Sequence, residues 1–175
     1  MPENAIAGLA EDIVRVARAR GVTIAVAESL TGGDLVSALV GVPGASAVVR
    51  GSVVAYATDL KATLLGVDAT LLAVKGAVHA DVARQMAAGA RRACGTAERP
   101  AALGVATTGV AGPEPQDGRP VGLVYVGIST GALPEHGAGS ESFAFEFAFP
   151  GDRPAVRRSA VHAALTALKD ALAAF

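Results

Sequence analysis

The sequence predicts an α/β protein: a three-layer α/β/α sandwich around a mixed, mostly buried sheet. Apolar runs of strand length alternate along the chain with segments of helical periodicity. Two further apolar runs lie close together late in the chain, which predicts a hairpin and therefore antiparallel strands beside parallel ones. No repeat or linker interrupts this order, so we expect one domain over residues 1–175.

The chain opens with a predicted helix, strand and helix. Residues 4–19 repeat apolar side chains at helical spacing between charges, and we expect this amphipathic helix to end near Gly21. Residues 22–27, VTIAVA, are typical of a short buried strand. Residues 31–41 return to helical spacing.

The middle of the chain predicts a further strand and two helices. The Val-rich run over residues 49–58 follows a loop and predicts a long strand. A helix follows over residues 59–67, with Asp59 as its expected N-cap. Residues 77–95 predict a longer helix stopped by Gly95.

Three strands are predicted in the second half. Residues 100–109 form a buried strand that runs into a glycine-rich loop over residues 108–122, and residues 121–129 form the next strand. Residues 140–149 alternate phenylalanine with small or charged residues, and such a period of two predicts an antiparallel or edge strand.

The final segment predicts a helix over residues 150–174. Asp152 supplies an N-cap oxygen, and Pro154 suits the first turn because its missing N–H would have no helical partner there. Apolar residues recur on one face and are expected to lie against the sheet.

Composition excludes several classes of protein. Lys and Arg number 15 against 16 Asp and Glu, so there is no electrostatic footprint for nucleic acid. No apolar run reaches the roughly 18 residues of a membrane span, and charged residues near the start argue against a signal peptide. The single cysteine, Cys94, excludes an internal disulfide and a Cys-rich metal site. We therefore expect a cytoplasmic domain without nucleic-acid or membrane partners.

Two loops at predicted strand ends are rich in hydroxyls and glycine: AESLTGG (27–33) and TTGVAGP (107–113). Ligands of α/β sheets gather at the carboxyl ends of strands, and amides at a helix N-terminus favour an anion such as phosphate or a developing oxyanion. Turns and caps would explain either loop alone. Two such loops at matching strand ends favour a site.

The first loop matches no nucleotide-binding fingerprint. It lacks both the P-loop pattern and the G-x-G-x-x-G of dinucleotide folds. It also departs from G-x-S-x-G, although Ser29 still lies at a sharp strand-to-helix turn like that of a hydrolase nucleophile.

A serine nucleophile needs a base. The candidates are the histidines and lysines, His79, His136, His162, Lys61, Lys75 and Lys169. None of the histidines follows a strand end, which weakens a Ser-His-Asp triad. Lys61 follows the Val-rich strand and could face a pocket as a neutral amine, although composition alone favours a solvated Lys61.

Six blocks occur in an order that resembles a known family. They are AESLTGG, GVPGASAVVRGSVVAYATDLKATLLGV, GAV, TTGVAGP, RPVGLVYVGI and FPGDRPAVRRSAV. In this order they resemble the CinA C-terminal domain family, from about residue 5 to residue 170. Stand-alone members of that family include nicotinamide-nucleotide amidohydrolases.

The resemblance implies hydrolysis of the carboxamide of nicotinamide mononucleotide to nicotinate mononucleotide and ammonia. It implies Ser29 as nucleophile, Lys61 as base and Tyr56 as a hydrogen-bond partner in the site. The substrate-binding residues would be those of the two loops, Thr31, Gly32, Gly33, Thr108, Gly109, Ala111 and Gly112. Such chemistry needs no metal and no cofactor, and no cluster of Cys, His and carboxylates has ligand spacing.

The chain departs from the family pattern at several positions. Leu30 stands where the family often has cysteine, which favours Ser29 as the nucleophile. Ala57 and Thr58 replace a usual Ser-Asn pair, and the loop EPQDGR (114–119) replaces a glycine-rich one. These changes keep open an alternative, a non-catalytic ligand-binding or oligomerisation domain of the same fold.

Two arginines have open roles at this stage. Arg50 could bind phosphate or be solvated, and Arg153 could contact phosphate or belong to a solvated helix face. The Val-rich and Phe-rich strands also make a homo-oligomer an expectation.

Overall fold

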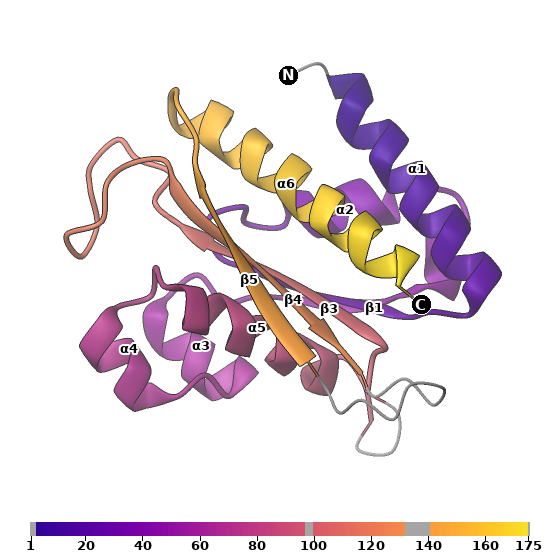
Figure 1. Cartoon of the computed structure of the whole chain (residues 1–175), viewed down its shortest axis with the longest axis horizontal. Coiled ribbons are helices and arrows are strands. Elements are labelled where there is room, and N and C mark those ends of the chain that lie inside the picture. The colour runs from indigo at the N-terminus through magenta and orange to yellow at the C-terminus, as the bar shows by residue number, and fades with distance from the viewer. Residues whose placement is uncertain (1–2, 97–99, 132–140, 175) are drawn as a thin grey trace.

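The computed structural model describes residues 3–96, 100–131 and 141–174, and it is a three-layer α/β/α sandwich around a five-stranded sheet (Figure 1). In chain order its elements are α1 (Glu3–Arg20), β1 (Ile24–Glu28), α2 (Asp34–Val40), the 3-10 turn η1 (Ala45–Ala47), β2 (Val49–Val54), α3 (Thr58–Leu65), α4 (Ala69–Lys75), α5 (Ala80–Ala93), β3 (Leu103–Gly109), β4 (Leu123–Thr130), β5 (Glu141–Ala148) and α6 (Arg153–Ala173). Helices α1, α2 and α6 cover one face of the sheet, and α3, α4 and α5 cover the other. None of the helices in the described ranges is long and apolar enough to cross a membrane.

The sheet is mixed, as the sequence predicts. Its strand order is β2-β1-β3-β4-β5, with β1 parallel to β2 and β3, and with β3, β4 and β5 antiparallel in turn. Since β1, β2 and β3 are parallel, their carboxyl ends meet at one edge of the sheet. Glu28, at the end of β1, lies opposite Val54 of β2 and Thr107 of β3. The chain therefore brings three strand-end loops together at this edge.

Each face of the sheet has its own core. Apolar residues of α1, α2 and α6 pack on one face, and those of α3 and α5 on the other. Helix α5 packs directly against the backbone of the sheet at two strand glycines. A Cβ on Gly104 would come 2.1 Å from the carbonyl oxygen of Ala87, and one on Gly127 would come 2.1 Å from that of Ala83. No larger residue fits at either position without moving the helix.

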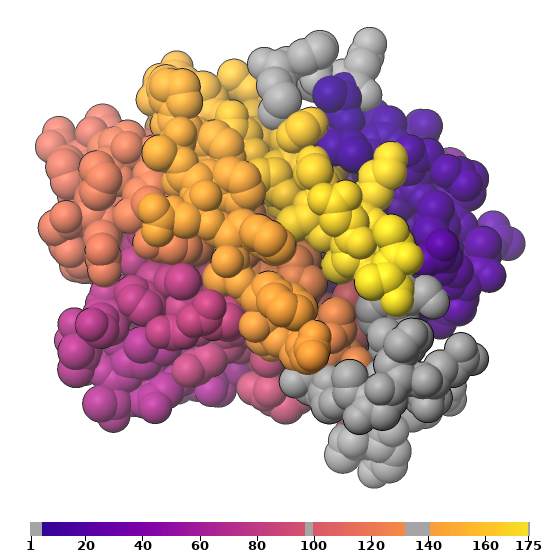
Figure 2. Space-filling model, in the orientation of Figure 1, coloured from indigo at the N-terminus to yellow at the C-terminus, as the bar shows by residue number. Residues whose placement is uncertain are grey.

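Strand β5 is the antiparallel edge strand that the alternating phenylalanines predict. In the space-filling view it runs along the visible surface beside α6 (Figure 2). Phe147 and Phe149 pack against the core under α6, whereas Phe143 and Phe145 are nearly half exposed. The apolar face is therefore buried only toward one end of the strand.

Local boundaries differ from the sequence predictions in the middle of the chain. Strand β2 ends at Val54, four residues before the end of the predicted run, and the amide of Ala55 completes its pairing with β1 by donating to the carbonyl oxygen of Glu28. Asp59 is not the N-cap of α3, because the helix starts one residue earlier, with Ala57 at the cap position and no side-chain cap bond. Asp152, by contrast, caps α6 as predicted by accepting from the amide of Ala155.

Helix α4 was not predicted. It begins after Asp68, whose carboxylate accepts from the amides of Thr70 and Leu71, and it ends at Lys75. Lys75, one of the candidate bases, is therefore the last residue of a helix. The short, weakly amphipathic segment lacked the periodicity that identifies a helix in sequence.

Candidate active site

Ser29 lies directly after β1, at the edge where the three parallel strands end. Its amide donates to the carbonyl oxygen of Thr107 on β3 at 3.1 Å, and its carbonyl oxygen accepts from the amide of Gly32 at 3.1 Å. Gly33 then turns the chain into α2 with a φ of 106°, a left-handed conformation that glycine adopts without strain. These contacts fix a tight strand-to-helix turn with the serine, 8% exposed, at its start.

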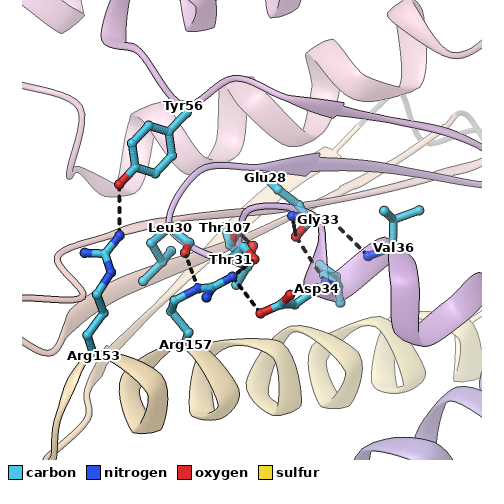
Figure 3. A network of polar contacts seen from close by, with 11 residues as sticks. Glu28, Leu30, Thr31, Gly33, Asp34, Val36, Tyr56, Thr107, Arg153 and Arg157 are labelled. Atoms are coloured by element: carbon cyan, nitrogen blue, oxygen red, sulfur yellow. Dashed lines mark hydrogen bonds and ion pairs between the residues drawn. The ribbon is translucent and has the colours of Figure 1, made fainter.

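Glu28, the last residue of β1, fixes the part of this turn that leads into α2. Its fully buried carboxylate accepts hydrogen bonds from the amides of Gly33 at 2.9 Å, Leu35 at 3.1 Å and Val36 at 2.9 Å (Figure 3). The anion at the start of α2 is thus the chain's own side chain. This corrects the expectation that these amides are available to an anionic ligand.

Lys61 contacts Ser29 from α3, the helix that follows β2. It lies on α3, is 1% exposed, and its Nζ donates to Ser29 Oγ at 3.1 Å and to the carbonyl oxygens of Ala55 at 2.8 Å and Tyr56 at 3.3 Å. Burial lowers the pKa of Lys61 to about 8, against a smaller opposing effect of the Asp59 carboxylate. A substantial fraction of the amine is therefore neutral in weakly basic solution.

The three partners of Lys61 suit both forms of the side chain, because the ammonium can donate to all three and the neutral amine to two of them. A neutral amine has two N–H groups and one lone pair, and the two carbonyl oxygens can only accept hydrogen bonds. When they take both N–H groups, the lone pair faces the one partner that can donate, the hydroxyl of Ser29. The arrangement can therefore remove a proton from the serine.

A cavity of about 130 Å³ opens above this pair. Its wall is made by Ser29, Leu30, Tyr56, Lys61, Ala77, Val78, Thr108, Gly109, Val110, Ala111, Gly112, Glu114, Gln116 and Arg153. The serine and lysine are buried, whereas the Tyr56 side chain is 60% exposed. The reactive pair thus lies at the floor of the cavity, with the tyrosine at its mouth.

The structure brings together only part of the residues that the sequence analysis assigned to substrate binding. Thr108, Gly109, Ala111 and Gly112 line the cavity, while Thr31, Gly32 and Gly33 are not among its lining residues. The hydroxyl of Thr31 pairs with that of Thr107 at 2.8 Å. This part of the first loop therefore shapes the turn behind the serine rather than the cavity wall.

Two arginines of α6 hold the site loops, and sequence reasoning did not assign them this role. Arg157 donates from Nε to the carbonyl oxygen of Leu30 at 3.0 Å and from Nη2 to that of Thr31 at 2.8 Å, and it pairs with Asp34 at 2.7 Å. Arg153, one turn earlier, points toward the tyrosine at the cavity mouth (Figure 3). The sequence does contain one signal for this role, since the two arginines lie one turn apart at the start of a predicted helix and therefore share a face.

Arg153 links two different loops. It donates to the carbonyl oxygen of Gly112 at 2.7 Å and to the hydroxyl of Tyr56 at 3.0 Å. The side chain therefore joins the loop after β3 to the loop after β2 across the mouth of the cavity.

Other candidates from the sequence lie elsewhere. His79 caps α5, where its Nδ1 accepts from the amide of Asp81, and His162 lies on α6 beside the phenylalanines of β5. Neither lines the cavity, and His136 lies outside the described residues. Arg50 donates to the carbonyl oxygen of Cys94 and is not part of the cavity wall. Within the described ranges, no group of three or more His, Cys, Asp or Glu residues could hold a metal ion.

Comparison with known proteins places this geometry in context. The family model of the CinA C-terminal domain matches residues 6–172. A CinA-like protein from Frankia casuarinae is 49% identical over 154 residues, which cover 88% of this chain and 33% of the relative. A CinA-like protein from Anaeromyxobacter dehalogenans is 46% identical over 157 residues, which cover 88% and 35%. The chain thus spans about a third of the length of these curated relatives.

Solved structures match over nearly their whole length. The competence/damage inducible protein CihA from Agrobacterium tumefaciens has a TM-score of 0.85 and 33% identity, and the match covers 98% of this chain and 97% of that one. A CinA superfamily protein from Klebsiella pneumoniae has a TM-score of 0.83 and 32% identity, with 97% and 99% covered. The fold and the sequence therefore agree on one family.

Proposed function

Because the chain belongs to the CinA C-terminal domain family, we propose that it hydrolyses the carboxamide of nicotinamide mononucleotide to nicotinate mononucleotide and ammonia. The observation that carries this proposal is the buried Lys61 amine, whose Nζ lies 3.1 Å from Ser29 Oγ at the floor of a cavity. Such a pair supplies a nucleophile and a base for the hydrolysis of an amide.

In the first half of the reaction, Ser29 Oγ attacks the carboxamide carbon while its proton passes to the neutral amine of Lys61. The tetrahedral intermediate then collapses as the C–N bond breaks. The Lys61 ammonium returns the proton to the leaving nitrogen, so ammonia departs and an ester to Ser29 remains. The lysine therefore acts first as base and then as acid.

In the second half, water attacks the ester and gives a proton to the Lys61 amine. The C–O bond to Ser29 breaks, and the ammonium of Lys61 protonates the serine oxygen. The product leaves as the carboxylic acid and passes its proton to ammonia or to bulk water to become the carboxylate, and both residues return to their starting states. Atoms and protons balance without an oxidant, a reductant or a further reactant.

The negative oxygen of each tetrahedral intermediate needs hydrogen-bond donors. Among the described contacts, the main-chain amides of Leu30, Ala111 and Gly112 have no acceptor, and all three residues line the cavity. Leu30 directly follows the nucleophile, the position that often supplies such an amide at a strand-to-helix turn. We assign these amides as candidate oxyanion donors.

Tyr56 acts through two parts of its structure. Its carbonyl oxygen holds the Lys61 amine at 3.3 Å, and its exposed ring stands at the mouth, where its hydroxyl accepts from Arg153. This supports a role in orienting the base and contacting the substrate outside the cavity floor.

The test is ammonia release from nicotinamide mononucleotide by purified protein. The folded Ser29→Ala variant provides the background, and nicotinamide and nicotinamide riboside provide the comparison substrates. Release by the wild type that exceeds the Ser29→Ala background supports the proposal. Binding of the mononucleotide without release above that background would instead identify a non-catalytic ligand-binding domain.

A further inference from the structure

Arg153 carries a positive charge without a carboxylate partner at the mouth of the cavity. Its hydrogen bonds go to two neutral acceptors, the carbonyl oxygen of Gly112 and the hydroxyl of Tyr56. Within the described ranges it forms no ion pair, whereas Arg157 on the next turn pairs with Asp34. A guanidinium has five N–H donors, so several remain for a ligand.

The cavity is too small to enclose a mononucleotide. Its volume of about 130 Å³ lies well below the ~300–1,000 Å³ of pockets that enclose drug-sized ligands. An aromatic ring with its carboxamide can enter toward Ser29, and the rest of such a substrate must then extend through the mouth. The mouth is where Tyr56 and Arg153 are exposed.

Tyr56 contacts both the base at the cavity floor and the guanidinium at the mouth, so it shows how far apart these two groups lie. The carbonyl oxygen of Tyr56 accepts from the Lys61 amine at the cavity floor, and its hydroxyl accepts from Arg153. The base and the guanidinium are therefore separated by about the reach of one tyrosine residue. In a pyridine mononucleotide the ring and ribose separate the carboxamide from the phosphate in the same way.

We propose that Arg153 binds the phosphate monoester of the substrate and thereby makes the site select nucleotides over nucleosides, an inference that rests on the proposed amidohydrolase function. Arginine recognises phosphate oxygens by paired, charge-assisted hydrogen bonds. Gly112 and Tyr56 hold the side chain at the mouth before the substrate arrives, so little of its freedom remains to be lost on binding.

Two other groups near the cavity that could bind an anion already have partners within the chain. Glu28 takes the amides at the start of α2, and the donors of Arg157 go to Leu30, Thr31 and Asp34. Lys61 lies at the floor with its own three partners. Glu114 also lines the wall, and its negative charge would repel phosphate rather than bind it.

The experiment compares Arg153→Gln with a matched control, Arg158→Gln. Both changes remove one positive charge from the same region of α6, but Arg158 is exposed outside the cavity wall. Two measurements are made on each folded protein: kcat/KM for nicotinamide mononucleotide and its riboside, and calorimetric binding of ribose 5-phosphate, which needs no turnover.

We expect Arg153→Gln to lower kcat/KM for the mononucleotide by about 10- to 100-fold, the usual effect of losing a charge-assisted hydrogen bond. The riboside rate should change little, and ribose 5-phosphate binding should weaken by a similar factor. Arg153→Lys should recover part of both losses, and Arg158→Gln should match the wild type.

Three results would overturn the proposal: an equal loss for mononucleotide and riboside, unchanged ribose 5-phosphate binding in Arg153→Gln, or no measurable binding to the wild type. An equal loss would indicate that Arg153 only holds the loops. Absence of ammonia release by the wild type would count against the proposed function, and ribose 5-phosphate binding would still decide the role of Arg153.

Discussion

The Nζ atom of Lys61 lies 3.1 Å from Oγ of Ser29, although the two residues are 32 positions apart in the chain. Ser29 directly follows β1, and Lys61 lies on α3, which starts four residues after β2 ends at Val54. The parallel pairing of β1 with β2 is therefore what brings them together.

Loss of either member of the pair should remove most of the activity. Ser29→Ala and Lys61→Ala should each lower kcat by about 10²–10⁴-fold, and the double variant should be little worse, since the two residues act as one unit. Lys61→Arg should fail as well, because a guanidinium stays protonated. The measurement is steady-state ammonia release after circular dichroism has shown that each variant is folded. A folded Lys61→Arg protein with wild-type kcat would rule out the lysine as base.

The rate should depend on pH through the same lysine. Because the working form is the neutral amine and its pKa is about 8, kcat/KM should rise about tenfold per pH unit below that value and level off above it. Nicotinamide riboside should give the same profile, which excludes ionisation of the phosphate as the cause. A profile that is flat between pH 6 and pH 9 would contradict this assignment.

The lowered pKa of Lys61 should also make the free energy of unfolding depend on pH. Between about pH 8 and pH 10.5 the folded protein has released this proton while the unfolded chain still holds it, so the free energy of unfolding rises with pH. Lys61→Met lacks this contribution. Denaturant titrations across this range should therefore show the difference between the two proteins shifting in favour of the wild type as pH rises. A constant difference would mean that burial does not perturb the lysine.

Glu28→Gln should loosen the turn that carries the nucleophile. The glutamine offers one carbonyl oxygen and an N–H₂ group where three amides need acceptors, so we expect a loss of about 1–3 kcal/mol in the free energy of unfolding and a lower kcat. Glu11→Gln, at an exposed position of α1, is the matched control and should change neither. Equal unfolding curves for Glu28→Gln and the wild type would argue against the capping role.

Gly89→Ala should destabilise the protein, whereas Gly8→Ala should not. A Cβ on Gly89 would lie 2.0 Å from the carbonyl oxygen of Leu65, so α3 must move away from α5, at a cost of about 1–3 kcal/mol. Gly8 has nothing within 4 Å, and alanine there should stabilise α1 by about 0.5–1 kcal/mol. Thermal unfolding of both variants measures the contrast. Because α3 carries Lys61, Gly89→Ala should also lower kcat.

Much of the architecture follows from local pattern. The alternating phenylalanines of residues 140–149 predicted an antiparallel edge strand, and Asp152 predicted the start of α6, because both signals act over a few residues. The prediction of Asp59 as the N-cap of α3 was wrong. An acidic residue is favourable at several positions of the first turn, so its presence does not fix the residue at which the helix begins. Helix α4 was missed because seven residues hold too little periodicity.

The site contacts that were missed join distant parts of the chain. Arg153 and Tyr56 are 97 positions apart, and Arg157 and Leu30 are 127 apart. No sequence spacing reports such a contact, so the sequence left Arg153 between a phosphate contact and a solvated helix face and assigned no contact to Arg157. Glu28 was visible as an acid beside Ser29, but its amide partners appear only once the turn is folded.

The two arginines of α6 also set an order of events during synthesis. Ser29, Tyr56, Lys61 and the loop at Gly112 all leave the ribosome before Arg153 and Arg157, whose side chains later hold the loops at Leu30, Tyr56 and Gly112 from α6. An emerging chain that already contains the whole sheet still lacks these clamps. The nucleophile can therefore be made early, but the assembled cleft should appear only after α6 has emerged and docked.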